Sequence, residues 1–161
     1  LLEMSNLQQV ARNEQIQLAP MIEEIFTDLA PLAEKNGITL KVEGDGSMTG
    51  SDALIYRLLF NLTENAVKYN SPGGSVQITV AQEPEKLLIR VSDTGRGIPE
   101  EYQRSIFQPF FRVDKSRSRE YGGAGLGLSL VWEITNLHGG SVWVEESSDK
   151  GTTIAVELPM Q

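Results

Sequence analysis

Two pairs of neighbouring strands are the feature of this sequence that most constrains its fold. Alternating apolar and polar residues predict one pair over 75–82 and 86–93 and another over 141–146 and 152–159. Because only short segments join the members of each pair, we expect both pairs to be antiparallel. Helices precede these pairs instead of alternating with single strands. The sequence therefore predicts an α+β fold, a two-layer α/β sandwich with helices on one face of a mixed, largely antiparallel sheet.

The helix expected over 51–69 has the clearest helical pattern. Ser51 is its expected N-cap, and Asp52 suits the first turn. Its apolar face consists of residues spaced by three or four, namely Leu54, Ile55, Leu58, Leu59, Leu62 and Ala66. This helix is expected to pack on the sheet.

Shorter elements are expected elsewhere. A helix over 20–37 is expected to carry Pro20 in its first turn and to end at Gly37, with Pro31 kinking or shortening it. The spacing of Leu1, Met4, Leu7 and Val10 predicts a helix over 1–13. The remaining expected elements are strands over 16–20 and 38–44, a short helix over 99–107 and a helix over 127–140.

Composition excludes several kinds of chemistry. The 161 residues include no Cys and one His, and the net charge is -8. Thiol chemistry is therefore excluded, and an acidic chain argues against nucleic acid as a general partner. No apolar run reaches the roughly 20 residues of a membrane span. Residues 104–119 differ, with five basic residues against one acidic residue, so they form either a solvated loop or a site for one anionic ligand.

Three polar residues share one face of the helix over 51–69. Asn61, Asn65 and Lys68 follow a spacing of four and three, away from the leucine stripe. Amide oxygens suit a hard cation such as Mg²⁺, and a lysine can meet a phosphate as a point charge. The alternative is an exposed polar face of an amphipathic helix.

Two glycine-rich segments suggest a ligand close to the backbone. Asp93, Gly95 and Gly97 form a D-x-G-x-G pattern at the end of an apolar strand, which indicates either a ligand site or a common turn. The segment GGAGLGL over 122–128 opens a helix, where backbone N–H groups can cradle phosphate. It matches neither the P-loop nor the Rossmann pattern, and the alternative is a flexible hinge. We expect residues 108–124 to form a long mobile loop.

Taken in order, these segments resemble the catalytic and ATP-binding domain of bacterial sensor histidine kinases. NLTENAVKY is similar to the N box of that family, DTGRGIP to its first G box and FQPFFRVD to its F box. GGAGLGL is similar to the second G box and KGTT to the third. The resemblance covers about residues 15–159 and implies the Bergerat-type ATP-binding fold.

The resemblance also implies roles for individual residues. Asn65 would be the main Mg²⁺ ligand, with Asn61 as a second candidate, and Asp93 would accept a hydrogen bond from the adenine amino group. Asn61, Asn65, Lys68, Arg112 and Lys115 would act on the phosphates, and Tyr69 would stack on the adenine. The other residues implied at the nucleotide are Gly95, Gly97, Ile98, Gly123, Ala124, Gly125, Leu126, Gly127, Leu128 and Thr152. Many relatives carry Thr or Ser where this chain has Ala124, so a side-chain hydroxyl is absent there.

For the whole protein, the resemblance implies phosphoryl transfer from Mg-ATP to a histidine outside this chain. Residues 1–13 would be the end of the dimerisation and histidine hairpin, and residues 14–161 the catalytic domain. The partners would be that dimerisation domain and a response regulator, in the cytoplasmic part of a membrane sensor. The alternatives are a non-catalytic nucleotide-binding module and a gyrase- or chaperone-type ATPase. The ATPases carry a Glu four residues before the main metal Asn, where this chain has Asn61.

Six aromatic or imidazole side chains remain to be placed. His138 is not expected to be the phosphoacceptor, since its place at the end of a helix suits the helix dipole. Trp132 and Trp143 are expected in the core. Phe107, together with Phe110 and Phe111, belongs either to the core or to the loop that follows.

Overall fold

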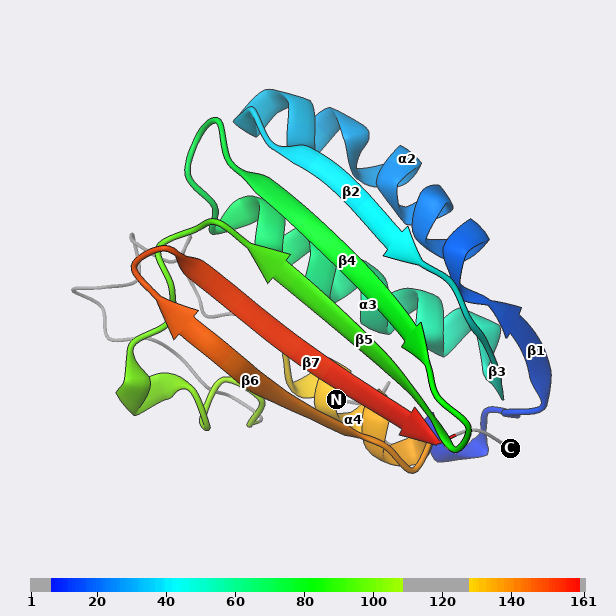
Figure 1. Cartoon of the computed structure of the whole chain (residues 1–161). Helices are drawn as coiled ribbons and strands as arrows, with labels where there is room; N and C mark the ends of the chain where they lie inside the picture. Colours follow the sequence, from blue (N-terminus) through cyan, green and yellow to red (C-terminus); the bar gives the residue numbers. More distant parts are fainter. Residues whose placement is uncertain (1–6, 109–127, 160–161) are drawn as a thin grey trace.

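The computed structural model describes residues 7–108 and 128–159, which form two layers. One layer is a five-stranded sheet in the order β2-β4-β5-β7-β6. Three helices lie against one face of this sheet, α2 (Leu18–Asn36), α3 (Asp52–Lys68) and α4 (Ser129–Leu137) (Figure 1). The predicted α+β sandwich is therefore confirmed.

The sheet is mixed, as predicted. β2 (Thr39–Gly44) pairs in parallel with β4 (Ser75–Gln82), and every other pairing in the sheet is antiparallel. β4 and β5 (Lys86–Asp93) form the first predicted pair. The second predicted pair is β6 (Ser141–Ser148) with β7 (Gly151–Pro159).

A small second sheet accompanies the first. β1 (Glu14–Gln17) pairs antiparallel with β3 (Ser47–Gly50), a strand that the sequence pattern did not predict. β3 is only four residues long and contains Gly50, so its local pattern is weak. Its pairing with β1 supplies the backbone bonds that a short strand needs.

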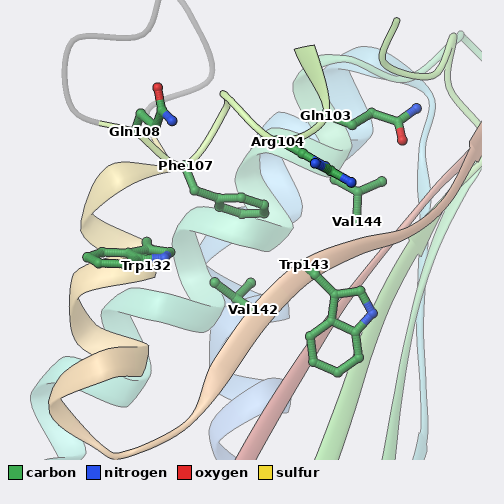
Figure 2. Close-up of a pocket in the computed structure, with 8 residues that line it drawn as sticks. All are labelled: Gln103, Arg104, Phe107, Gln108, Trp132, Val142, Trp143 and Val144. Carbon is green, nitrogen blue, oxygen red and sulfur yellow. The ribbon is translucent and has the colours of Figure 1, made fainter. Parts of the chain in front are cut away.

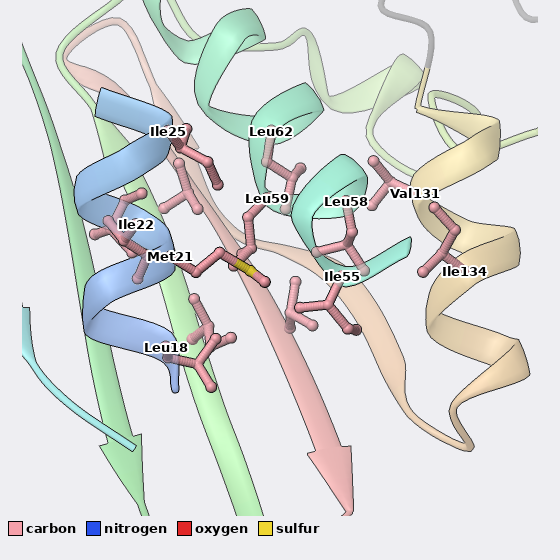
Figure 3. Close-up of a cluster of buried hydrophobic side chains, with 14 of the residues drawn as sticks. Leu18, Met21, Ile22, Ile25, Ile55, Leu58, Leu59, Leu62, Val131 and Ile134 are labelled. Carbon is pink, nitrogen blue, oxygen red and sulfur yellow. The ribbon is translucent and has the colours of Figure 1, made fainter. Parts of the chain in front are cut away.

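The core lies between the helices and the sheet (Figure 3). The predicted stripe of α3 is buried along its whole length, and Ile55, Leu58 and Leu59 have no exposed surface. Ile22 and Ile25 of α2 pack against it from one side, while Val131 and Ile134 of α4 lie on the other. Burying each such side chain contributes about 1.5–3 kcal/mol before entropy is subtracted. α3 is therefore the central helix of the domain.

Three sequence predictions need correction. Of the helix expected over 1–13, the described part contains only a 3₁₀ turn, η1 (Leu7–Gln9), and the chain leaves it before β1. Pro31 does not shorten α2, which runs on to Asn36 and ends at Gly37 in the left-handed conformation. Buried residues on both sides of Pro31 hold the helix in place. The helix expected over 99–107 is only a 3₁₀ turn, η2 (Glu100–Tyr102).

His138 joins the end of α4 to the beginning of α3. Its Nδ1 lies 2.9 Å from the carbonyl oxygen of Ile134, and its Nε2 accepts from the backbone N–H of Ser51 at 3.0 Å. A carbonyl only accepts and a backbone N–H only donates, so the proton of the neutral ring sits on Nδ1. Ser51 is the N-cap of α3, as predicted, and its hydroxyl accepts from the N–H of Leu54 at 3.2 Å.

These contacts fix the charge state of His138. Burial lowers the pKa of the imidazole, the positive charge of Arg12 lowers it further, and the bond to Ile134 acts in the opposite direction. The sequence had suggested a favourable helix-dipole contact for a histidine here, but the structure holds the ring neutral. Because both ring nitrogens are engaged inside the domain, the geometry agrees with the expectation that His138 is no phosphoacceptor.

Acid should therefore destabilise the domain through this one histidine. The unfolded chain binds a proton near its ordinary pKa of 6.5, whereas the folded chain does so only at lower pH. The free energy of unfolding should thus be highest above pH 6.5 and fall as the pH drops below it. Urea unfolding at several pH values should show this slope.

The matched variant is His138→Gln, whose amide oxygen can accept from Ser51 but does not titrate. The chain has no other histidine, so the slope just below pH 6.5 should flatten in this variant. An equal slope in both proteins would contradict the assignment.

Candidate nucleotide site

A cavity lies where the end of α3, the end of β5 and the beginning of β7 meet the beginning of α4. Most of its wall is apolar, with Asp93, Asn65 and Thr152 among the polar side chains. Seven residues predicted for the nucleotide line it, namely Asn65, Tyr69, Asp93, Gly97, Ile98, Leu128 and Thr152. The structure thus brings together residues that lie up to 87 positions apart in the chain.

Asp93 is tied to its surroundings through one oxygen. Its Oδ1 accepts from the backbone N–H of Gly95 at 2.8 Å and from that of Thr152 at 3.2 Å. Within the described residues, both hydrogen bonds of the carboxylate end on Oδ1, which leaves Oδ2 to accept from a ligand. Burial raises the pKa of Asp93, and the two N–H donors partly offset this rise.

Two glycines allow the backbone segments around the cavity to approach closely. Gly97 has a φ of +84°, and a Cβ there would lie 2.0 Å from the carbonyl oxygen of Ser148. Gly151 has a φ of +141°, and its Cβ would lie 2.0 Å from the carbonyl oxygen of Asp93. Only glycine fits such positions. The first was predicted from the D-x-G-x-G pattern, whereas Gly151 lies in the KGTT segment of the third G box but was given no role of its own at the nucleotide.

The predicted polar face of α3 is only partly at the cavity. Asn65 lines it, but Asn61 and Lys68 do not. Lys68 is half exposed, and its Nζ lies 3.8 Å from Oε1 of Glu64. Such an exposed pair contributes little to stability, so Lys68 remains available to a phosphate. Tyr69 caps the helix, and burial, followed by the charge of Glu64, raises the pKa of its phenol.

Several predicted residues lie outside the described part of the chain. They are Phe110, Phe111, Arg112, Lys115, Gly123, Ala124, Gly125, Leu126 and Gly127. Nearly all of the loop expected over 108–124 lies there as well. Leu128, which follows directly, is buried where α4 begins.

Some lining residues were missed. Val91 and Ile154 lie opposite each other in β5 and β7, two positions along the strands from the pair Asp93 and Thr152. Strand alternation places residues two apart on the same face, so this signal was present in the sequence. Leu62 and Ala66 also line the cavity, although their spacing predicted a purely structural stripe.

A second, more open cavity of about 460 Å³ lies between residues 103–108, α4 and β6 (Figure 2). Trp132 and Trp143 line it and are 46% and 37% exposed, so the prediction that both are core residues is wrong. Trp132 lies on α4, and Trp143 lies on β6, an edge strand of the sheet. Phe107 is buried and belongs to the core.

The described residues hold no group of three or more His, Cys, Asp or Glu side chains placed to bind a metal ion. Within 7–108 and 128–159, no helix combines the length and apolar character needed to cross a membrane.

The fold and the cavity together define a class, the ATP-binding domains with the Bergerat fold. A family model described as histidine kinase-, DNA gyrase B-, and HSP90-like ATPase matches residues 50–161. The chain therefore belongs to this family. Its relatives narrow the assignment to the catalytic, ATP-binding domain of a sensor histidine kinase.

Two curated relatives illustrate this. The chain is 39% identical over 137 residues to the sensor histidine kinase RppB of Synechocystis sp., covering 85% of this chain and 30% of RppB. It is 45% identical over 107 residues to the sensor histidine kinase WalK of Bacillus subtilis, covering 65% of this chain and 18% of WalK. The chain thus spans less than a third of either relative.

Solved structures agree. The catalytic domain of the histidine kinase ThkA matches with a TM-score of 0.80 and 28% identity, covering 91% of this chain and 95% of that one. A structure of ThkA in complex with the response regulator protein TrrA matches with a TM-score of 0.79, covering 99% of this chain and 45% of that one. The identity in the second match is 24%, so it supports the fold alone.

Proposed function

We propose that this domain binds Mg-ATP and transfers its γ-phosphate to a histidine on the dimerisation domain of the parent kinase. The observation that carries the proposal is the carboxylate of Asp93, which lies in a largely apolar cavity. Among the described residues, only its Oδ1 accepts hydrogen bonds, so Oδ2 can accept from a ligand. Family membership supports the activity, and the cavity supports the kind of ligand.

Asp93 favours adenine over guanine. Its Oδ2 can accept from the exocyclic amino group of adenine, whereas guanine has a carbonyl oxygen at that position. Two oxygens facing each other in a cavity would leave both without a donor, which is costly. Apolar neighbours such as Val91 and Ile154 would pack on the base.

Asn65 fits a magnesium ion that ATP brings with it. Its half-buried amide lies in the cavity wall, on the same helix as Asn61 and Lys68. One amide oxygen is a weak ligand set by itself, which suits Mg²⁺ because this ion keeps several waters and shares phosphate oxygens. Asn65 would hold the ion, with Asn61 nearby, and the ion would neutralise phosphate charge when bound.

The transfer step needs a nucleophile from outside. An imidazole nitrogen attacks the γ-phosphorus, a P–N bond forms, the bond from that phosphorus to the β,γ-bridging oxygen breaks and ADP leaves. Asn65, Lys68, Arg112 and Lys115 would position the phosphates and offset their charge. His138 is engaged within the fold. The attacking histidine would therefore belong to the dimerisation domain of the parent.

The phosphoryl group would next pass to a response regulator, in keeping with the sensor histidine kinases among the relatives of this chain. The parent would be a sensor with this domain in the cytoplasm. A gyrase-type hydrolysis of ATP has less support. In those ATPases a Glu acts as the general base four residues before the metal-binding Asn, and this chain has Asn61 at that position. The neighbouring Glu64 lies near Lys68 and does not line the cavity.

Asp93→Asn should exchange the acceptor for a donor with little change of shape. Two N–H groups already point at Oδ1, so the new amide oxygen should take that place and its NH₂ should face the ligand. ATP affinity should fall about tenfold to a hundredfold and the preference for ATP over GTP should shrink. Calorimetric titration with both nucleotides measures this.

Asp45→Asn is the matched control. The Oδ1 of Asp45 also accepts from two backbone N–H groups, those of Ala19 and Gly46, but away from the cavity. Its nucleotide affinities should be those of the native chain. Unchanged ATP and GTP affinities in Asp93→Asn would refute the base assignment.

Asn65→Ala should remove the dependence of nucleotide binding on magnesium. The Kd for ATP with Mg²⁺ and with a chelator should differ in the native chain and converge in the variant. Asn136→Ala, at an exposed position of α4, serves as the control and should behave as the native chain does. A variant that keeps its full response to Mg²⁺ would disprove the metal assignment.

The domain should phosphorylate a separate histidine hairpin of its own parent, but not itself. Mixing the two with Mg²⁺ and γ-labelled ATP should label the hairpin in an acid-labile, alkali-stable form. A hairpin variant without its acceptor histidine is the control. If the domain binds ATP while the hairpin remains unlabelled, the domain is a binding module and not a kinase.

A further inference from the structure

A row of three polar side chains crosses the sheet at the wall of the nucleotide cavity. Asp93 of β5 lies opposite Thr152 of β7, and Thr152 lies opposite Ser147 of β6. Ser147 does not line the cavity, but its Oγ lies 2.8 Å from Oγ1 of Thr152. The row therefore links a lining residue to a hydroxyl behind it.

The Ser147–Thr152 hydrogen bond can run in either direction, but only one direction uses the proton of Ser147 within the described part of the protein. The Oγ of Ser147 accepts from the backbone N–H of Ile98 at 2.8 Å. Among the described residues, only Oγ1 of Thr152 is then placed to receive the proton of Ser147. If Ser147 donates to Thr152, the N–H of Ile98 and the hydroxyl of Ser147 both have acceptors. The hydroxyl proton of Thr152 is then left to point at a ligand.

We propose that Ser147 is a positioning residue of the nucleotide site, whose hydroxyl orients Thr152 as a hydrogen-bond donor toward the base. This inference rests on the proposed function. The cavity then presents an acceptor, Asp93, beside a donor, Thr152. Adenine carries the complementary pair on one edge, an amino group that donates and the ring nitrogen N1 that accepts. Guanine carries the reverse order on that edge, so the row adds to the discrimination that Asp93 provides.

Ser147 also holds the loop around Ile98, which forms another part of the wall of the nucleotide cavity. Its bond to the N–H of Ile98 anchors the loop that carries Gly97, and Ile98 itself lines the cavity. One hydroxyl thus fixes both the donor and the loop beside it. Its removal should affect recognition of the base and leave the core intact, since Ser147 is only half-buried.

The experiment compares ATP with 1-deaza-adenosine triphosphate, in which a C–H group replaces N1 and the amino group remains. The native chain should bind ATP about threefold to tenfold more tightly than the analogue, the value of one hydrogen bond. In Ser147→Ala this ratio should approach one, because Thr152 is no longer oriented. Ser147→Thr restores a hydroxyl and should restore the ratio.

Ser92→Ala is the matched control. Ser92 and Thr153 form the same kind of cross-strand hydroxyl pair, at 2.9 Å between facing positions of β5 and β7, but on the other face of the sheet. This variant should keep the native ratio. Its melting temperature shows what the loss of such a pair costs in stability alone.

The outcomes separate the two proposals. No ATP binding by the native chain would overturn the proposed function and this inference with it. ATP binding without discrimination against the analogue would overturn only the role of the row. An unchanged ratio in Ser147→Ala, or an equal loss of affinity for both nucleotides, would show that Ser147 does not orient Thr152.

Discussion

The hydrogen bonds to Oδ1 of Asp93 are the interaction on which the nucleotide site depends. They join the end of β5 to the loop after it through Gly95 and to the first residues of β7 through Thr152. A buried carboxylate is costly by itself, and burial raises its pKa accordingly. Two backbone donors reduce this cost before any ligand arrives. The same carboxylate can therefore be both a structural joint and a recognition group, with one oxygen assigned to each task.

Most of the fold could be predicted from the sequence because it follows from local periodicity. The paired strands β4–β5 and β6–β7 and the central helix α3 have strong patterns and short connections. The predictions that were wrong concern places where tertiary packing overrides the local signal. Helix α2 continues through Pro31 because buried residues hold it on both sides. β3 exists through its pairing with β1, and the exposure of Trp132 depends on which side of α4 faces the sheet.

The site divides in a similar way. Asp93, Gly97 and Thr152 could be placed from the sequence because their motifs follow a family order, and the cavity contains all three. Ser147 could not, because its relation to Thr152 depends on the register of β6 against β7. That register shifts between Val144 and Glu146, so counting alternate residues from the start of β6 gives no reliable face for Ser147. Cross-strand contacts of this kind arise from pairing, which local patterns do not contain.

The two ends of α3 have different tasks. At its beginning, the hydroxyl of Ser51 caps the helix by accepting from the N–H of Leu54. The N–H of Ser51 donates to His138, which holds the end of α4 beside it. At its end, Asn65 and Tyr69 line the cavity, and Leu128 at the beginning of α4 lines it as well. α3 carries the groups at its end about 25 Å from its pinned beginning, along 17 residues. A buried helix of this kind cannot tilt without opening the core. The polar groups at the cavity are thus held in place by packing, which lets half-exposed residues such as Lys68 adjust to the phosphates.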